Sequence, residues 1–134
     1  MLPRMKKAIL CLLLWSLAAT GHAASFDCKK AATRIEKQIC ADALLSKLDS
    51  ALADNYLGML EEADFGGAQE NRRIRAAIKA EQRAWLARRN TCKDRSCLIE
   101  AYRVRINETC DYGVVQGAHP VCVMADSVIE EGAK

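Results

Sequence analysis

Apolar side chains recur at helical spacing along a long segment near the middle of the chain. Between residues 43 and 63, steps of three and four positions place them on one stripe, made of Leu45, Leu48, Leu52, Tyr56, Met59 and Ala63. This spacing predicts an amphipathic helix. We expect its other polar side chains to lie largely off the stripe, namely Lys47, Asp49, Ser50, Asp54 and Glu61.

A second long helix is predicted over residues 69–90, after a break at residues 64–67 where paired glycines favour open backbone. Its apolar face consists of Ile74, Ala77, Ile78, Ala84 and Trp85. Glu81 falls on the same face, which is unusual for a carboxylate. Two long amphipathic segments joined by a short break favour an antiparallel helical hairpin.

A short helix is predicted on the N-terminal side of this hairpin. Thr33 and Glu36 match a capping box ahead of a helix over residues 34–39. Asp42 is placed to cap the long helix that follows.

On the C-terminal side, a fourth helix is predicted over residues 97–109, with Leu98, Tyr102 and Ile106 on one face. For residues 114–123 we expect a short hairpin or a pinned loop, and for residues 127–134 a frayed end. The predicted fold class is therefore all-α, an antiparallel helical hairpin or small bundle.

The first 23 residues have the three regions of a secretory signal. Basic residues precede an apolar run over residues 8–19, and small residues follow up to Ala23. The run is shorter than the roughly 20 apolar residues that a membrane-spanning helix needs. No lipoprotein cleavage motif precedes Cys28, so we expect cleavage after Ala23 or Ala24, no membrane anchor afterwards, and a product in the periplasm or outside the cell.

Cysteine usage agrees with export. The chain has seven cysteines, and removal of the leader would leave six, an even number that predicts a disulfide framework. Cys97 and Cys110 lie roughly 20 Å apart if one helix carries both, which is beyond disulfide reach. Six cysteines allow 15 pairings. Sequential pairing avoids this problem and is the one that we expect: Cys28–Cys40, Cys92–Cys97 and Cys110–Cys122.

Charge is balanced once the leader is set aside, because the leader holds three of the 20 Lys/Arg and none of the 17 Asp/Glu. This balance argues against a generic nucleic-acid-binding or membrane-surface protein. Residues 42–70 nevertheless carry seven acids against Lys47, and residues 72–105 carry eleven bases against three acids. Two interpretations stay open: solvated faces with weak ion pairs, or a two-faced surface with an acidic rim from Asp49 to Glu70.

The sequence offers little for catalysis or metal binding. It contains no phosphate-binding loop and no dinucleotide fingerprint, and His119 is the single histidine after the leader. Cys92 and Cys97 alone are too weak a metal signature. We therefore expect no enzyme, no metal and no other cofactor. A weaker alternative is a buried Glu81 acting as an acid with a raised pKa, although pairing with Arg88 or Arg105 is the commoner fate of such a residue.

Several short motifs occur in a fixed order along the chain. Residues 26–42 contain Phe-Asp-Cys and then Thr-Arg-Ile-Glu-Lys-Gln-Ile-Cys-Ala-Asp, and Leu48-Asp49 leads to Tyr56. Residues 82–86 read Gln-Arg-Ala-Trp-Leu, followed by Arg89, Cys92, Cys97-Leu98, Ala101-Tyr102 and Arg105-Ile106. This ordered set, spanning residues 26–108, resembles the LprI-type lysozyme inhibitor family, a group of small exported bacterial domains.

The resemblance implies an all-helical fold, Cys28–Cys40 and Cys92–Cys97 bridges, an envelope location and, for the family's named member, inhibition of lysozyme. Its polar and aromatic motif side chains are expected to be structural: Asp27, Glu36, Gln82, Trp85, Arg89 and Tyr102. From the residues themselves, we expect Trp85 in the core and Arg89 either capping the C-terminus of its helix or holding carbonyls there.

The chain also departs from the family pattern. Asn90 stands where an acid is expected after Arg89, and the segment bounded by Cys110 and Cys122 is an addition. The predicted organisation is therefore a signal peptide over residues 1–23, a helical domain over 24–109 and a disulfide-pinned extension over 110–134.

Two functions follow as hypotheses. The first is an exported binding protein that inhibits lysozyme-type muramidases or another cell-wall hydrolase. Because many lysozymes are strongly cationic, the acidic segment is the expected contact surface, through Glu61, Glu62, Asp64 and Phe65, with Phe65 as the anchor. The alternative is a structural or stress-related periplasmic protein without catalysis. It would bind another protein or an anionic wall component through the basic residues between Arg72 and Arg105.

Overall fold

The computed structural model describes residues 24–64, 66–112 and 122–133. The predicted leader, Phe65, His119 and most of the expected tail hairpin lie outside these residues. Within them, regular structure is entirely helical, as predicted. The elements are the short 3-10 helix η1 (Cys28–Lys30), α1 (Arg34–Ala41), α2 (Ala43–Glu62), α3 (Ala68–Arg89), α4 (Arg95–Asp111) and α5 (Ala125–Gly132).

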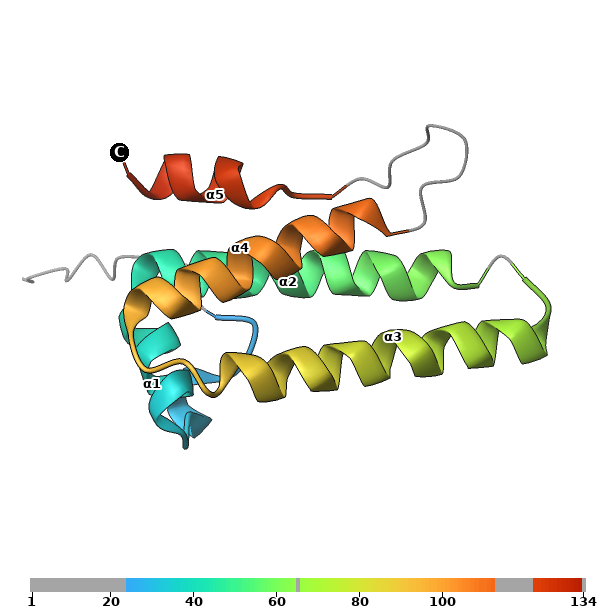
Figure 1. The fold of residues 1–134 in the computed structure, drawn as a ribbon, viewed down its shortest axis with the longest axis horizontal. Coiled ribbons are helices and arrows are strands. Elements are labelled where there is room, and N and C mark those ends of the chain that lie inside the picture. Colours follow the sequence, from blue (N-terminus) through green and yellow to red (C-terminus); the bar gives the residue numbers. More distant parts are fainter. Residues whose placement is uncertain (1–23, 65, 113–121, 134) are drawn as a thin grey trace, which may run out of the picture.

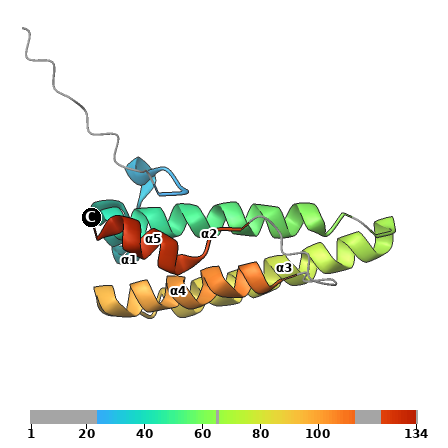
Figure 2. The same cartoon turned by 90° about the horizontal axis from the view of Figure 1, so that it is seen from above.

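Helices α2 to α5 alternate in direction along the long axis of the molecule (Figure 1). Helices α2 and α3 form the predicted antiparallel hairpin, and α1 lies at the end opposite the turn that joins them (Figures 1 and 2). Helix α2 nevertheless packs most extensively against α4 and only sparsely against α3. The centre of the bundle is therefore the α2/α4 pair, with α3 and α5 on opposite sides of it (Figure 1).

The helices begin where the sequence offers caps. Both halves of the predicted capping box form, with the Thr33 side chain accepting from the Glu36 amide and the Glu36 carboxylate accepting from the Thr33 amide. The Asp42 carboxylate accepts from the Leu44 and Leu45 amides, each at 3.0 Å, and starts α2. These local contacts explain why the predicted and observed starts of α1 and α2 agree.

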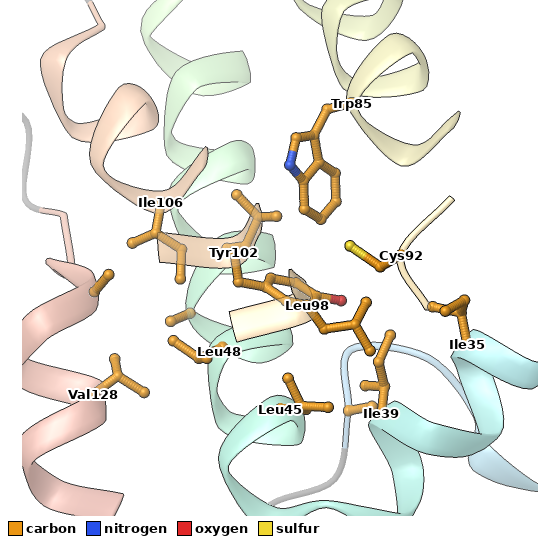
Figure 3. Close-up of a cluster of buried hydrophobic side chains, with 14 residues drawn as sticks. Ile35, Ile39, Leu45, Leu48, Trp85, Cys92, Leu98, Tyr102, Ile106 and Val128 are labelled. Carbon is orange, nitrogen blue, oxygen red and sulfur yellow. The ribbon is translucent and has the colours of Figure 1, made fainter. Parts of the chain in front are cut away.

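The main core joins the predicted stripes of α2 and α4 (Figure 3). Leu98, Tyr102 and Ile106 are fully buried on α4, as predicted. They pack with Leu45, Leu48 and Leu52 of α2, Ile35 and Ile39 of α1, and Trp85 of α3. A smaller cluster near the α2–α3 turn contains Met59, Leu60, Ala63 and Ile78.

The predicted apolar face of α3 is only partly correct. Ile78 and Trp85 are buried, but Ala77, Glu81 and Ala84 are exposed. The reason is that α3 makes few contacts with its neighbours. A residue at the helical spacing of the apolar face can therefore still be exposed to solvent. The exposure of Glu81 also removes the burial on which an acid role for this residue depended.

All three predicted disulfides are present: Cys28–Cys40, Cys92–Cys97 and Cys110–Cys122. The first ties η1 to α1, the second closes the turn between α3 and α4, and the third joins the end of α4 to the segment before α5. The guanidinium of Arg34 also donates to the Cys92 carbonyl, which fastens α1 to the α3–α4 turn.

The predicted frayed end over residues 127–134 is wrong, because Ala125–Gly132 forms helix α5. Ala125 is fully buried, Val128 is nearly so, and the helix packs against both α2 and α4. Asn55 of α2 donates to the Val123 carbonyl and accepts from the Val123 amide, both at 2.9 Å. The described residues of the C-terminal extension are thus part of the packed bundle.

Candidate functional site

A buried polar cluster occupies the end of the bundle next to α1. Asp49 of α2 is only 5% exposed. One of its carboxylate oxygens accepts from the Tyr102 hydroxyl at 2.6 Å, and the other accepts from the amide and hydroxyl of Ser25 at 2.8 and 2.6 Å. The expectation that Asp49 lies off the apolar stripe is therefore wrong, and Asp49 cannot belong to the acidic rim of the second charge interpretation. Its charge is buried and its hydrogen-bonding capacity is used.

Arg89 supplies the opposite charge to this cluster. Its guanidinium lies 3.8 Å from the Asp49 carboxylate and donates to the Tyr102 hydroxyl at 3.0 Å. It also donates twice to the Asn90 side-chain oxygen, so the amide of Asn90 takes the place of the expected acid. The expectation that Arg89 caps the end of α3 or holds carbonyls there is wrong, because its guanidinium donates to the side chains of Tyr102 and Asn90.

Aromatic contacts complete the cluster. The Trp85 ring meets the Tyr102 ring edge-on, with centroids 5.2 Å apart, and the Arg89 guanidinium lies 5.4 Å from the Trp85 centroid. The Trp85 indole N–H donates to the Ala101 carbonyl at 3.2 Å. Burial, and next the nearby charge of Asp49, raise the pKa of Tyr102 far above its ordinary value, so its hydroxyl remains a donor.

The other motif side chains make local contacts. The Asp27 carboxylate accepts from the Lys29 amide at 3.0 Å and starts η1. Gln82 accepts from Arg105 at 3.2 Å, and Arg105 also donates to Glu108 at 3.3 Å. Neither Arg105 nor Arg88 pairs with Glu81 among the described residues. The backbone bonds of the capping box lower the pKa of Glu36 and keep it ionised.

A groove of about 640 Å³ opens beside this cluster, between α2, α3 and the N-terminal segment. Asp49 and Arg89 line it from the cluster side. Its other walls come from Leu52, Ala53 and Tyr56 of α2, from Lys79, Gln82, Arg83, Trp85, Leu86 and Asn90, and from Ser25, Phe26 and Glu36. The groove exists because α2 and α3 pack sparsely against each other. Sequence periodicity alone could not have shown it.

The predicted acidic site lies at the other end of the hairpin. Glu61 is exposed, Glu62 is partly buried and Asp64 is exposed in the turn, while Phe65 is outside the described residues. Arg75 of α3 lies 3.0 Å from Asp64 and donates to the Leu60 carbonyl at 2.6 Å. The charge of Asp64 is therefore partly offset, whereas Glu61 has no ion pair within the described part of the chain.

An exposed leucine extends this acidic region along α2. Leu57 is 56% exposed, the largest value among the large hydrophobic side chains described. Asp54 and Glu61, both exposed, lie three residues before it and four residues after it, which places all three on one face of the helix. We call Asp54, Leu57 and Glu61 the acidic strip. The sequence already indicated that Leu57 is exposed, because Leu57 lies between the positions of the apolar stripe and so points away from the core.

Two further features bear on the kind of site. None of the described helices combines the length and apolarity needed to cross a bilayer. The described residues also contain no group of three or more His, Cys, Asp or Glu side chains placed to hold a metal ion.

Comparison with known proteins places the chain in a family. A family model described as lysozyme inhibitor LprI matches residues 28–109. The chain is 33% identical over 86 residues to proteins named lipoprotein LprI from Mycobacterium bovis and Mycobacterium tuberculosis. That match covers 61% of this chain but 39% of each relative, so the chain corresponds to well under half of their length. No solved structure matches it. Since the family model covers more than half of its residues, the chain belongs to the LprI lysozyme inhibitor family.

Proposed function

We propose that the protein is an exported inhibitor of lysozyme-type muramidases and that it binds its target through the acidic strip. The family match supports the inhibitor role, and the predicted leader supports an envelope location. The observation that carries the surface assignment is Leu57, because a leucine that is 56% exposed between two carboxylates is suited to contact a cationic partner.

The charged and apolar side chains of the acidic strip have different roles in such a contact. Asp54 and Glu61 attract a cationic enzyme and orient it, while Leu57 loses water when the two surfaces meet. Glu62 and Asp64 continue the negative charge along the sequence toward Phe65, which we keep as a proposed anchor in addition to Leu57. Because the target's catalytic carboxylates lie in its cleft, an inhibitor bound across that cleft blocks access of the wall glycan.

The test is a titration of the exported, oxidised protein into a lysozyme that is degrading cell walls. We expect inhibition at micromolar excess, and the inhibition should weaken as salt is raised because the attraction between exposed charges is screened. No loss of lysis at that excess would contradict the proposed function for the enzyme tested.

Two matched variants test the surface. Asp54→Asn with Glu61→Gln removes two charges from the acidic strip, and Asp126→Asn with Glu130→Gln removes two exposed charges from α5. We expect the first to raise the inhibition constant about tenfold or more and the second to change it little. Equal effects would show that net charge, rather than this strip, carries the binding.

A second candidate function rests on α3. This helix carries seven Lys/Arg side chains against Glu70 and Glu81, and all but the buried Arg89 are partly or fully exposed. The helix lies on the side of the bundle away from α5 (Figure 1). Such a surface favours an anionic wall component as ligand. Salt-sensitive retention of the protein on purified peptidoglycan is the expected result, and absence of retention at low salt would contradict it.

A further inference from the structure

The groove between α2 and α3 is not used by the proposed inhibitory contact, because the acidic strip lies outside it. Its volume of about 640 Å³ falls in the range of small-molecule sites. It also has the mixed lining of such sites, with Tyr56 and Phe26 beside the side-chain amides of Gln82 and Asn90. The groove is therefore a candidate ligand site separate from the acidic strip.

The acids that line the groove are already engaged. Asp49 accepts from Ser25 and Tyr102 and lies beside Arg89. The Glu36 carboxylate accepts from the amides of Ala32 and Thr33 at 2.8 and 2.9 Å. Neither carboxylate is left to attract a cationic ligand into the groove.

The cations at the mouth of the groove are free. Lys79 and Arg83 both line it and stand four residues apart, so they share one face of α3. Within the part of the chain that the structure describes, neither forms a hydrogen bond or an ion pair. Two like charges at this spacing repel each other, and an anion placed between them would relieve that repulsion.

Two uncharged side chains that line the groove, Gln82 and Asn90, also have unused hydrogen-bond donors. Gln82 uses its side-chain oxygen to accept from Arg105, and Asn90 uses its own to accept from Arg89. The two amide nitrogens of these side chains donate to no described residue. A ligand that matches this lining carries negative charge and several hydrogen-bond acceptors on a body small enough for the groove.

We propose that the groove binds a small carboxylate-bearing sugar derivative. Lys79 and Arg83 hold its carboxylate, the amides of Gln82 and Asn90 donate to its hydroxyl or acetamido oxygens, and Tyr56 packs against its ring. This proposal deepens the second candidate function, since it names a ligand class and a site for an anionic wall component. It is independent of lysozyme inhibition through the acidic strip.

The experiment compares probes by NMR titration of the exported, oxidised protein. N-acetylmuramic acid carries the carboxylate on a lactyl ether at its O3, and N-acetylglucosamine is the same sugar without that ether. We expect N-acetylmuramic acid to shift amide signals of residues 52–56 and 79–90, with N-acetylglucosamine at least about tenfold weaker because the charged contact is missing. No shift with millimolar N-acetylmuramic acid, or shifts confined to other residues, would overturn the proposal.

Other anions separate the possible sources of the signal. Acetate and inorganic phosphate test whether any anion suffices, and dodecyl phosphate tests a lipid-like ligand. We expect all three to bind more weakly than N-acetylmuramic acid. Equal binding by acetate, or tighter binding by dodecyl phosphate, would overturn the assignment of a sugar ligand.

Matched variants locate the site. Lys79→Gln with Arg83→Gln should weaken binding of N-acetylmuramic acid about tenfold or more, whereas Arg72→Gln with Arg73→Gln, the same charge change on the same helix outside the groove, should leave it nearly unchanged. Both pairs are exposed, so unchanged thermal unfolding serves as the control for folding. Equal weakening by the two pairs would show that the overall charge of α3 carries the binding, and it would overturn the assignment of the ligand to the groove. The second candidate function, binding of an anionic wall component by α3, would not be contradicted by that result.

Discussion

The two ends of the bundle differ in the size of their cores and in the burial of their ion pairs. At the end that holds α1, which we call the braced end, the large core surrounds a buried ion pair, and the Cys28–Cys40 and Cys92–Cys97 disulfides lie close by. At the α2–α3 turn, which we call the free end, the core has four buried residues, and the cross-helix ion pair between Arg75 and Asp64 is largely exposed.

This difference separates stability from recognition. Charges at the braced end are desolvated, so each needs its partners and tolerates little change. Charges near the free end are solvated, so they can be exchanged at little cost and remain available to a partner protein. We therefore expect substitutions at the braced end to change the free energy of unfolding, and those along the acidic strip to change binding instead.

The largest effect is expected from Asp49→Ala. It leaves the buried Arg89 without its carboxylate and frees the Tyr102 hydroxyl and Ser25 amide, and loss of one partner from such a cluster costs about 3–5 kcal/mol. Urea unfolding at neutral pH measures this change. Asp54→Ala, on the same helix but exposed, should stay within about 0.5 kcal/mol of the parent. Similar values for the two variants would mean that the cluster does not stabilise the braced end.

A smaller but still large effect is expected when Cys28 and Cys40 are both replaced by Ser. This bridge spans 12 residues, and loss of a bridge of this size costs about 2–4 kcal/mol, mostly because the unfolded chain regains freedom. The native helical signal in circular dichroism should persist at low temperature while the midpoint of thermal unfolding falls. An unchanged midpoint would show that the capping box and Arg34 brace α1 without the disulfide.

At the braced end, the sequence predicted where the helices start, but it did not predict which polar side chains are buried together. Local signals such as Thr33, Glu36 and Asp42 act through contacts within a few residues, so the starts of α1 and α2 were predicted correctly. Asp49 was misplaced because a helical pattern records only whether a residue is polar. The partners that permit its burial come from Ser25, Tyr102 and Arg89, which are distant in the sequence.

The same limit explains the other differences. Ala77 and Ala84 match the period of α3 but are exposed, because the pattern does not show how sparsely α3 packs. Helix α5 has two turns and few apolar residues, so its burial depends on the surface that α2 and α4 present. The groove is likewise a product of helix arrangement. Only Glu61 belongs both to the predicted acidic site and to the acidic strip.

A modest, local effect is expected from Arg75→Ala at the free end. Arg75 donates to the Leu60 carbonyl and pairs with Asp64, and both groups are partly exposed, so the cost should be about 1 kcal/mol or less. Hydrogen exchange should quicken for amides near the α2–α3 turn and stay unchanged around Tyr102. Faster exchange throughout the bundle would show that the two ends unfold as one unit.

A similarly small effect, which depends on pH, is expected at Asp42. This residue caps α2 at the braced end and contacts Arg95 of α4 at 2.5 Å. The hydrogen bond from Arg95 holds the pKa of Asp42 below its ordinary value, so ionised Asp42 favours the folded state. The stability from this source is present above the unfolded pKa of about 3.9 and is lost as pH falls through the lower folded pKa.

Asp42→Asn keeps a good cap but removes the charge, and should cost about 0.5–1 kcal/mol at pH near 7. We expect the difference between parent and variant to shrink in urea unfolding as the pH is lowered from about 4 toward 2. The exposed Asp54→Asn serves as control, and a difference that stays constant with pH would mean that the carboxylate acts at this position only as a cap.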